Sequence, residues 1–373
     1  MNNLWNSVLD TLAKKPNSIS IISSFVAAII GMLLGFVLMF FVSPADSFGA
    51  FFTMVTGPFQ SMSRIGMVVR SSVPILLTGL SVAFAFRTGL FNIGASGQMM
   101  IGGILAIYVG IHWDFLGPFH WIVAMFAGIV GGALWGLIPG LLKAFRNVHE
   151  VVTSIMLNYV ALYISRLMIL TFFHDTLQAS SERVPRSARI PEGFLPRLFG
   201  GQPVDIGIII AIGAAIIIHV VLNHTTFGYE LKSVGLSRAA AQYAGIKEKR
   251  SVVLSMLIAG ALAGLAGALY FLVGDRRFGL SDGIIEHGFT GIAIALLALS
   301  APLGVIVAAF FYGVIYRGGW LIQTEYREEI VDIIIGFIIY FSALSLFTKQ
   351  VIGNYLRRKT KRDIEAATKE GDV

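Results

Sequence analysis

The sequence predicts an all-α polytopic membrane protein with about ten transmembrane helices and with both termini in the cytoplasm. Hydrophobic residues make up 56% of the 373 residues, charged residues only 13%, and the mean hydropathy is +0.78. A soluble domain carries about 25% charged residues. The net charge of +7 comes from Lys and Arg next to apolar stretches, which indicates membrane topology and lipid contact and not a nucleic-acid partner.

Ten apolar stretches follow one another, most of them near the ~17–25 residues that cross a bilayer. They are residues 19–42, 73–86, 98–111, 120–142, 151–173, 206–222, 252–273, 284–299, 303–316 and 330–347. The second, third and ninth are short, so a broken or re-entrant helix is expected there. The prediction is one transmembrane domain over residues 19–348, with cytoplasmic segments 1–18 and 349–373.

Basic residues set the predicted orientation. Ten crossings from a cytoplasmic N-terminus place Arg87, Lys143 with Arg146, the loop 223–251 and the basic tail all on the inner side. The loop 174–205 is predicted outside. Its four prolines favour an extended external loop, and longer loops follow the charge rule less strictly.

A polar, glycine-rich stretch interrupts the apolar pattern between residues 87 and 104. Asn92, Ser96 and Gln98 supply uncharged hydrogen-bonding groups among five glycines. Irregular polar backbone at membrane depth persists only where protein or a water-filled cavity covers it. The stretch is therefore either part of a transport pathway or a short loop between two spans.

A short internal repeat accompanies this stretch. The segment from Arg87 to Gly94 resembles the segment from Arg277 to Ile284, and the predicted topology puts the two on opposite sides of the membrane. An inverted repeat with a substrate path between its halves has this pattern, although so short a match also arises by chance.

Glycines at intervals of four predict close helix packing. They occur at Gly31 and Gly35, at Gly128, Gly132, Gly136 and Gly140, and at Gly260 and Gly264 with Ala268. Small residues let helices approach closely in lipid, so these stripes are interpreted as structural.

Asn158 lies on a small, polar stripe of the fifth predicted span, together with Ser154, Ala161 and Ser165. An intramembrane Asn of this kind contacts either a transported solute or a neighbouring helix. Both interpretations are open on this pattern alone.

A second informative stretch lies in the loop 223–251. Ser237 is a good N-cap and Gly245 a good helix stop, which predicts a helix of about two turns. So short a helix is marginal alone in water. It therefore docks on a partner or lies on the lipid headgroups, which its basic flanks also favour.

No catalytic or metal-binding constellation is visible. The chain has no cysteine, no phosphate-binding glycine loop with its Lys, and seven scattered histidines. An enzyme is not expected, and any ATP that drives transport is bound by another polypeptide. An ion-coupled secondary transporter needs an intramembrane ionisable residue, for which Glu286 is the nearest candidate. A channel or a membrane scaffold is a further alternative, which would not need a docking helix in the loop 223–251.

Three motifs together resemble a known family. Residues 89–99, 150–159 and 235–245 are similar to permease subunits of bacterial ABC importers, in the group that serves branched-chain amino acids, ribose-type sugars and nucleosides. The sequences of these motifs are most similar to those of the nucleoside (guanosine-type) permeases. Ser96 departs from the pattern, because an acid is common there in relatives.

The resemblance implies import of a nucleoside across the bacterial cytoplasmic membrane, with a simple sugar as the alternative substrate. It also implies three partners: a cytoplasmic ATPase, a second permease, expected to be a different chain, and an extracellular substrate-binding lipoprotein. The expected substrate pathway consists of Phe91, Asn92, Ser96, Gln98, Asn158 and Tyr159. The expected ATPase-coupling residues are Gly235, Ser237, Arg238, Ala239, Ala240, Ala241, Tyr243 and Gly245.

Overall fold

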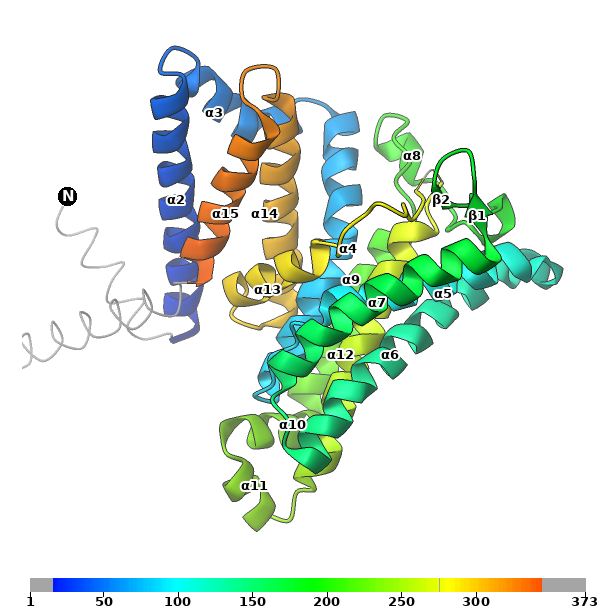
Figure 1. Ribbon diagram of the computed structural model, residues 1–373. Coiled ribbons are helices and arrows are strands. Elements are labelled where there is room, and N and C mark those ends of the chain that lie inside the picture. The colour runs from blue at the N-terminus through cyan, green and yellow to red at the C-terminus, as the bar shows by residue number, and fades with distance from the viewer. Residues whose placement is uncertain (1–15, 275, 344–373) are drawn as a thin grey trace, which may run out of the picture. The chain divides into compact units, whose positions relative to one another are not determined.

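The computed structural model describes residues 16–274 and 276–343, which are mostly helical (Figure 1). The predicted all-α polytopic class is confirmed. The chain divides into two compact units. The first combines Met1–Phe51 with Glu325–Val373, and the second is Phe52–Thr324.

The first unit pairs α2 (Pro16–Val42) with α15 (Glu328–Ala343) in antiparallel fashion. Gly35, from one of the predicted small-residue pairs, lies against Ile334, so that a Cβ atom there would be 2.6 Å from the Ile334 Cγ2 atom. The Tyr326 hydroxyl lies 3.2 Å and 3.1 Å from the carbonyl oxygens of Met39 and Ser43 and holds the two ends together.

The second unit holds the seven described helices that are long and apolar enough to cross a membrane. They are α4 (Met62–Arg87), α5 (Ala95–His112), α6 (His120–Arg146), α7 (Glu150–Phe172), α9 (Gly207–His224), α12 (Glu248–Phe271) and α14 (Pro302–Leu321). The other described elements here are α3 (Ser47–Thr56, shared with the first unit), η1 (Gly57–Phe59), η2 (Asp114–Phe119), β1 (His174–Asp175), β2 (Ser180–Ser181), η3 (Arg186–Ala188), α8 (Leu195–Leu198), α10 (Thr226–Leu236), α11 (Arg238–Tyr243) and α13 (His287–Leu297).

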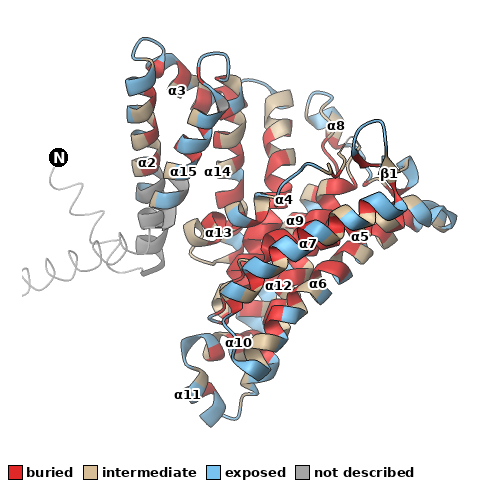
Figure 2. Ribbon diagram, in the orientation of Figure 1, coloured by how far each residue is buried: buried red, intermediate tan, exposed pale blue. Residues whose placement is uncertain are grey.

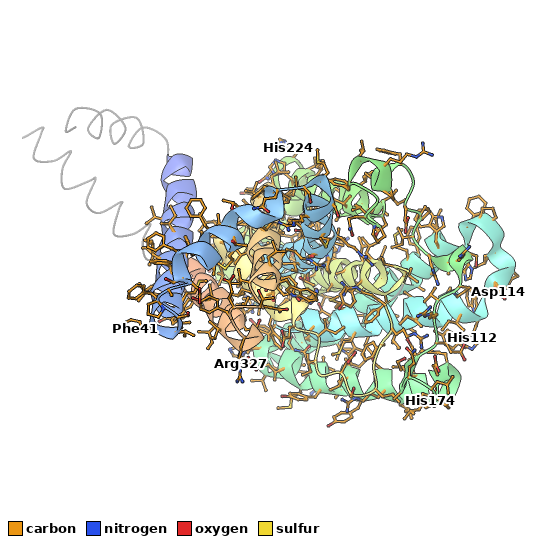
Figure 3. All side chains as sticks on the ribbon, turned by 90° about the horizontal axis from the view of Figure 1, so that it is seen from above. Phe41, His112, Asp114, His174, His224 and Arg327 are labelled. Atoms are coloured by element: carbon orange, nitrogen blue, oxygen red, sulfur yellow. The ribbon has the colours of Figure 1, made fainter. Side chains whose placement is uncertain are left out.

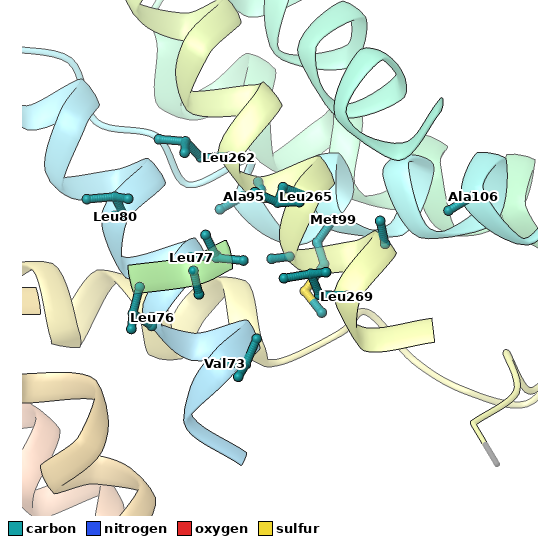
Figure 4. Packing of buried hydrophobic residues seen from close by; sticks show 14 of the residues in the cluster. Val73, Leu76, Leu77, Leu80, Ala95, Met99, Ala106, Leu262, Leu265 and Leu269 are labelled. Atoms are coloured by element: carbon teal, nitrogen blue, oxygen red, sulfur yellow. The ribbon is translucent and has the colours of Figure 1, made fainter. Parts of the chain in front are cut away.

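The core of this unit is formed by α4, α5 and α12, whose residues are mostly buried, whereas α7 exposes one long face (Figure 2). Figure 4 shows part of that core, with Leu77 and Leu80 of α4, Met99 of α5 and Leu265 of α12. An apolar side chain that faces lipid gains little by burial, so shape and close approach decide which helix faces pack inward.

The predicted glycine stripes on α6 and α12 pack against each other. A Cβ atom on Gly132 would lie 2.5 Å from the Gly264 Cα atom, and one on Gly136 would lie 2.9 Å from the Gly260 Cα atom. Gly102 of α5 lies against Gly264 in the same way. The three backbones are therefore closer than any side chain would allow, which confirms the structural interpretation.

The prediction of a broken helix at the second, third or ninth span is wrong, because α4, α5 and α14 have 26, 18 and 20 residues. The helix α4 begins at Met62 instead of Val73, because Ser61 caps it by accepting a hydrogen bond from the Arg64 backbone N–H at 3.2 Å. The eighth predicted span, in contrast, contains a helix too short to cross the membrane. The helix α13 has 11 residues, or about 16 Å of length against a hydrocarbon core of about 30 Å.

The predicted external loop contains a small sheet at the end of α7. The strands β1 and β2 are antiparallel, with His174 opposite Ser181. The Ser181 backbone N–H donates to the Phe278 carbonyl at 2.8 Å, which ties this loop to the segment after α12. Figure 3 shows His112, Asp114 and His174 near one another at this end, and His112 and Phe173 have ring centroids 6.3 Å apart.

The end of the second unit away from β1 and β2 carries several of the basic residues. The Lys249 ammonium lies 5.6 Å from the centre of the Phe145 ring, and Gly235 packs on the Arg87 carbonyl. Three of the basic clusters used for the topology prediction therefore share one end, as one cytoplasmic side requires.

Candidate functional site

A reciprocal pair of amides is at the centre of the glycine-rich stretch. After α4 the chain turns at Gly89, where φ is +70°, and α5 begins at Ala95. The Asn92 side-chain amide donates to Gln98 Oε1 at 2.8 Å, and the Gln98 amide donates to Asn92 Oδ1 at 3.0 Å. Both side chains are buried, so each satisfies the other where water is absent.

Ser81 of α4 extends this pair to a third helix. Asn92 Nδ2 also donates to Ser81 Oγ at 3.1 Å, and that hydroxyl donates to the Ala259 carbonyl of α12 at 2.6 Å. The irregular segment before α5 is thus held to both α4 and α12 by hydrogen bonds inside the core.

Asn158 joins α7 to the start of α5. Its Oδ1 atom accepts the Gly97 backbone N–H at 2.8 Å, and its amide donates to the Ile93 carbonyl at 3.1 Å. Gly97 is needed for this approach, because a Cβ atom there would lie 2.7 Å from Asn158 Oδ1. A side chain from α7 therefore satisfies one of the first N–H groups of α5, which have no partner within their own helix.

The N-termini of α5 and α13 meet at Ser96. The Gly288 backbone lies against the Ser96 backbone and hydroxyl, and any side chain at residue 288 would overlap them. Thr78 of α4 donates to the His287 carbonyl at 2.8 Å. Ser96 Oγ is buried and has no hydrogen-bond partner among the described residues.

These contacts bring together a set of buried, uncharged residues that we call the polar cluster. It consists of Thr78, Ser81, Asn92, Ser96, Gln98 and Asn158. Two helix N-termini point into it, and each carries a partial positive charge. The arrangement can bind hydroxyl and carbonyl oxygens, and it resembles the interrupted helices that hold substrates near the bilayer midplane in transporters.

The two segments of the predicted repeat reach this region from opposite ends. The Arg87 guanidinium donates to the Ser300 carbonyl at 2.9 Å at the end that carries α10 and α11. Arg277 pairs with Asp175 at the other end. The helix that follows each arginine starts in the interior, at Ala95 and at His287. This geometry supports an inverted relation between the two segments.

Two residues expected in the pathway lie apart from the polar cluster. Tyr159 is 52% exposed on the outer face of α7, whereas its neighbour Asn158 faces inward. Phe91 is half-buried and packs on Phe86, with ring centroids 5.0 Å apart. Sequence reasoning missed Thr78, Ser81 and Gly288.

The short helix predicted between Ser237 and Gly245 is present as α11. Ser237 Oγ accepts the Ala240 backbone N–H at 3.3 Å, and Gly245 ends the helix with φ +81°. Ala241 is buried against an apolar group that includes Leu90. Tyr243 is 97% exposed, as an apolar contact residue for a partner would be.

The helix α10 connects this region to the polar cluster. A Cβ atom on Gly89 would lie 3.2 Å from the Gly235 Cα atom, so the two backbones touch. Thr88 accepts a hydrogen bond from Ser255 of α12 at 2.9 Å. A displacement of α10 therefore acts on the segment that carries Asn92.

Among the described residues, no group of three or more His, Cys, Asp or Glu side chains is placed to hold a metal ion. The chemistry available at the polar cluster is that of neutral amides, hydroxyls and backbone N–H groups.

The family described as "Branched-chain amino acid transport system / permease component" matches residues 64–343. The chain belongs to this family. It is a permease component of a transport system and a multi-pass protein of the cytoplasmic membrane. The match covers the seven crossing helices of the second unit almost completely, with both N-termini that meet at Ser96.

Relatives extend the similarity over nearly the whole chain. The guanosine ABC transporter permease protein NupP of Bacillus subtilis is 37% identical over 90% of this chain and 96% of its own length. The nucleoside ABC transporter permease protein NupB of Lactococcus lactis is 33% identical over 93% and 96%. The glucose ABC transporter permease protein TsgB13 of Haloferax volcanii is 30% identical over 83% of each chain. No solved structure matches the chain.

Proposed function

We propose that this permease is the membrane-spanning subunit of an ABC importer that moves a nucleoside inward across the cytoplasmic membrane. The observation that carries the proposal is the polar cluster, in which uncharged hydrogen-bonding groups surround two helix N-termini at membrane depth. The names of the relatives NupP and NupB support the substrate class.

The chemistry of the polar cluster suits a neutral, polar solute. Amides both donate and accept hydrogen bonds, so Asn92, Gln98 and Asn158 match ribose hydroxyls and the edges of a base. The side chains of the polar cluster carry no ionisable group that would couple movement to a proton or an ion. The naming of the relatives as ABC transporter permeases supports ATP, bound by a partner, as the source of energy.

The path is closed in this state. Asn92, Ser96, Gln98 and Asn158 are each at most 1% exposed, so a solute reaches them only after helices move apart. We propose that a cytoplasmic ATPase produces this movement through α11. A force on α11 passes through Ala241 and α10 to Gly89, where the segment that carries Asn92 begins.

Two further partners complete the proposal. A substrate-binding lipoprotein delivers the nucleoside at the end that carries β1 and β2. A second permease, a different chain, covers the exposed face of α7, where Tyr159 and Tyr163 place hydroxyl groups near the middle of the 23-residue helix. Tyrosine is enriched at the membrane surface and not at its centre, so protein is a better neighbour for these hydroxyls than lipid.

Uptake of labelled solutes tests the substrate. A deletion strain complemented with the complete transporter should accumulate labelled guanosine, and an excess of unlabelled nucleosides should abolish this uptake. A sugar permease is the second candidate, because TsgB13 is named for glucose. Uptake of glucose or ribose without uptake of any nucleoside would establish the sugar permease instead.

A further inference from the structure

A recess lies near the end of the second unit opposite α11, between α4, α12 and the start of α9. Its cavity volume is only about 20 Å³, so a solute enters it only after side chains move apart. Its lining residues are Arg70, Val73, Pro74, Asp205, Leu269, Tyr270, Val273 and Arg276. Charged, aromatic and apolar groups thus share one small space that the polar cluster does not include.

Some side chains that line this recess have hydrogen-bonding groups without a partner in the described part of the chain. Among the described residues, the guanidinium groups of Arg70 and Arg276 have no hydrogen-bond or ion-pair partner. Asp205 is 7% exposed, and its Oδ1 atom accepts the Gly207 backbone N–H at 2.7 Å. Each guanidinium carries five N–H donors in a rigid plane, so the recess can donate to a flat ligand and accept from it.

Tyr270 and Arg276 both line this space. The Arg276 guanidinium lies over the Tyr270 ring, with its central carbon 3.8 Å from the ring centre. The ring is held edge-on by Phe271 and by His287, whose ring centroids lie 4.9 Å and 5.0 Å away. A planar group is therefore already stacked where a base would stack, and aromatic side chains bind bases in this way.

The recess is adjacent to the polar cluster along α4 and next to the start of α13. Pro74 lines the recess, and Thr78, one turn further along α4, belongs to the cluster. Tyr270 packs on His287, whose neighbour Gly288 closes over Ser96. A solute that leaves the recess thus meets the start of α13 next and then the amides of the cluster.

We propose that this recess is the entry subsite for the substrate and that it selects 6-oxopurine nucleosides such as guanosine and inosine. Tyr270 stacks on the base after Arg276 moves aside, Arg70 donates two hydrogen bonds to O6 and N7, and Asp205 accepts from N1–H. The planar fork of an arginine fits the two adjacent acceptors of guanine. Adenine presents a donor at position 6, and a pyrimidine has no N7 acceptor.

The inference rests on the proposed function, and its test separates the two. Uptake is measured with the complete transporter for guanosine, 7-deazaguanosine (which lacks the N7 acceptor) and uridine. We expect the native transporter to take up guanosine about five- to tenfold more efficiently than 7-deazaguanosine, because the analogue loses one of the two acceptors of the bidentate contact.

The decisive variant is Arg70→Lys, which keeps the positive charge and removes the planar pair of N–H donors. We expect it to reduce guanosine uptake to the level of 7-deazaguanosine and to leave uridine uptake unchanged, which also shows that the variant folds. Arg64→Lys is the matched control on the same helix, because Arg64 bonds to the Gly57 carbonyl outside the recess. It should preserve the native preference.

Tyr270 is tested separately. Tyr270→Leu should weaken uptake of all three nucleosides, whereas Tyr270→Phe, which keeps the stacking face, should retain it. An Arg70→Lys variant that keeps the native ratio of guanosine to 7-deazaguanosine, or that lowers all three uptakes equally, overturns the subsite. Absence of any nucleoside uptake by the native transporter overturns the proposed function itself.

Discussion

Asn92 and Gln98 pair through both amide groups, because each donates a hydrogen bond to the side-chain oxygen of the other. Buried polar networks of this kind are stable only when every member is paired. A passing nucleoside must therefore replace these bonds one for one, with its own hydroxyl groups or base edge. Ser96, with its unpartnered hydroxyl, is the residue of the cluster that is free to bind first.

Burial of the Asp205 carboxyl group in the recess affects the stability of the fold. Burial is the main cause that raises the pKa of its carboxyl group above the ordinary value, and the Gly207 N–H and Arg70 oppose this only in part. For an acid with a raised pKa, the folded state loses stability as pH rises from the unfolded pKa through the folded one. Burial of this carboxylate therefore carries a stability cost at a pH where the group is ionised.

Asp205→Asn should therefore stabilise the purified protein at neutral pH. Asn keeps the Oδ1 acceptor for Gly207 and removes the buried charge. We expect the unfolding midpoint at pH 7.5 to rise by about 2–4 °C, the shift that about 1 kcal/mol produces in a domain of 150–250 residues. The advantage should shrink as pH falls towards the ordinary pKa of Asp. A lower midpoint at pH 7.5 would show that the charge stabilises the fold.

At the scale of single elements, the packing of α5, α6 and α12 depends on backbone contact. Gly264 touches both Gly132 and Gly102, so a methyl group there meets main-chain atoms that cannot move independently. Gly213 of α9 has nothing within 4 Å of its Cβ position. The same substitution at these two glycines therefore has opposite consequences.

Gly264→Ala should destabilise the protein by about 1–3 kcal/mol, the usual cost of overpacking a tight interior. Gly213→Ala should be neutral or stabilising by up to about 1 kcal/mol, because alanine favours a helix over glycine. Thermal unfolding in detergent, followed by size-exclusion chromatography, measures both. Equal loss in the two variants would contradict the backbone-contact interpretation.

The helix α11 is exposed on the side away from Ala241, so bulk can be added there without disturbing the interior. Ala240→Trp should abolish uptake and weaken co-purification of the ATPase, while the permease itself stays folded. Ile217→Trp, a matched change at a 63% exposed site on α9, should leave both unaffected. Normal uptake and normal co-purification by Ala240→Trp would refute the coupling role of α11.

At the scale of the second unit, the proposed solute path is closed along its length. The recess, the start of α13, the polar cluster and the Gly89–Gly235 contact follow one another from one end to the other. A path of this kind alternates between states that open to either side, and ATP changes their populations.

The absence of cysteine from the sequence makes this closure measurable. In Ser96→Cys, the new thiol should resist a water-soluble methanethiosulfonate reagent at rest and react at least about tenfold faster during ATP-driven transport, because the side chain is buried only while the path is closed. Tyr243→Cys, at a 97% exposed position, should react equally under both conditions. Equal labelling of Ser96→Cys with and without ATP would contradict a path through this cluster.

The sequence by itself determined the features that depend on local order along the chain. Hydropathy predicted the crossing helices, Ser237 and Gly245 predicted the ends of α11, and the spacing of four predicted the glycine contacts, because caps and helix periodicity act over a few residues.

Only the tertiary structure decided which polar groups meet. The Thr78–His287 bond joins residues 209 positions apart, and Gly288 meets Ser96 across a similar distance in the sequence. Asn158 and Tyr159 are adjacent in the chain, yet one is buried and the other exposed. A bond between distant residues depends on how the helices pack, and no pattern within either segment encodes its partner.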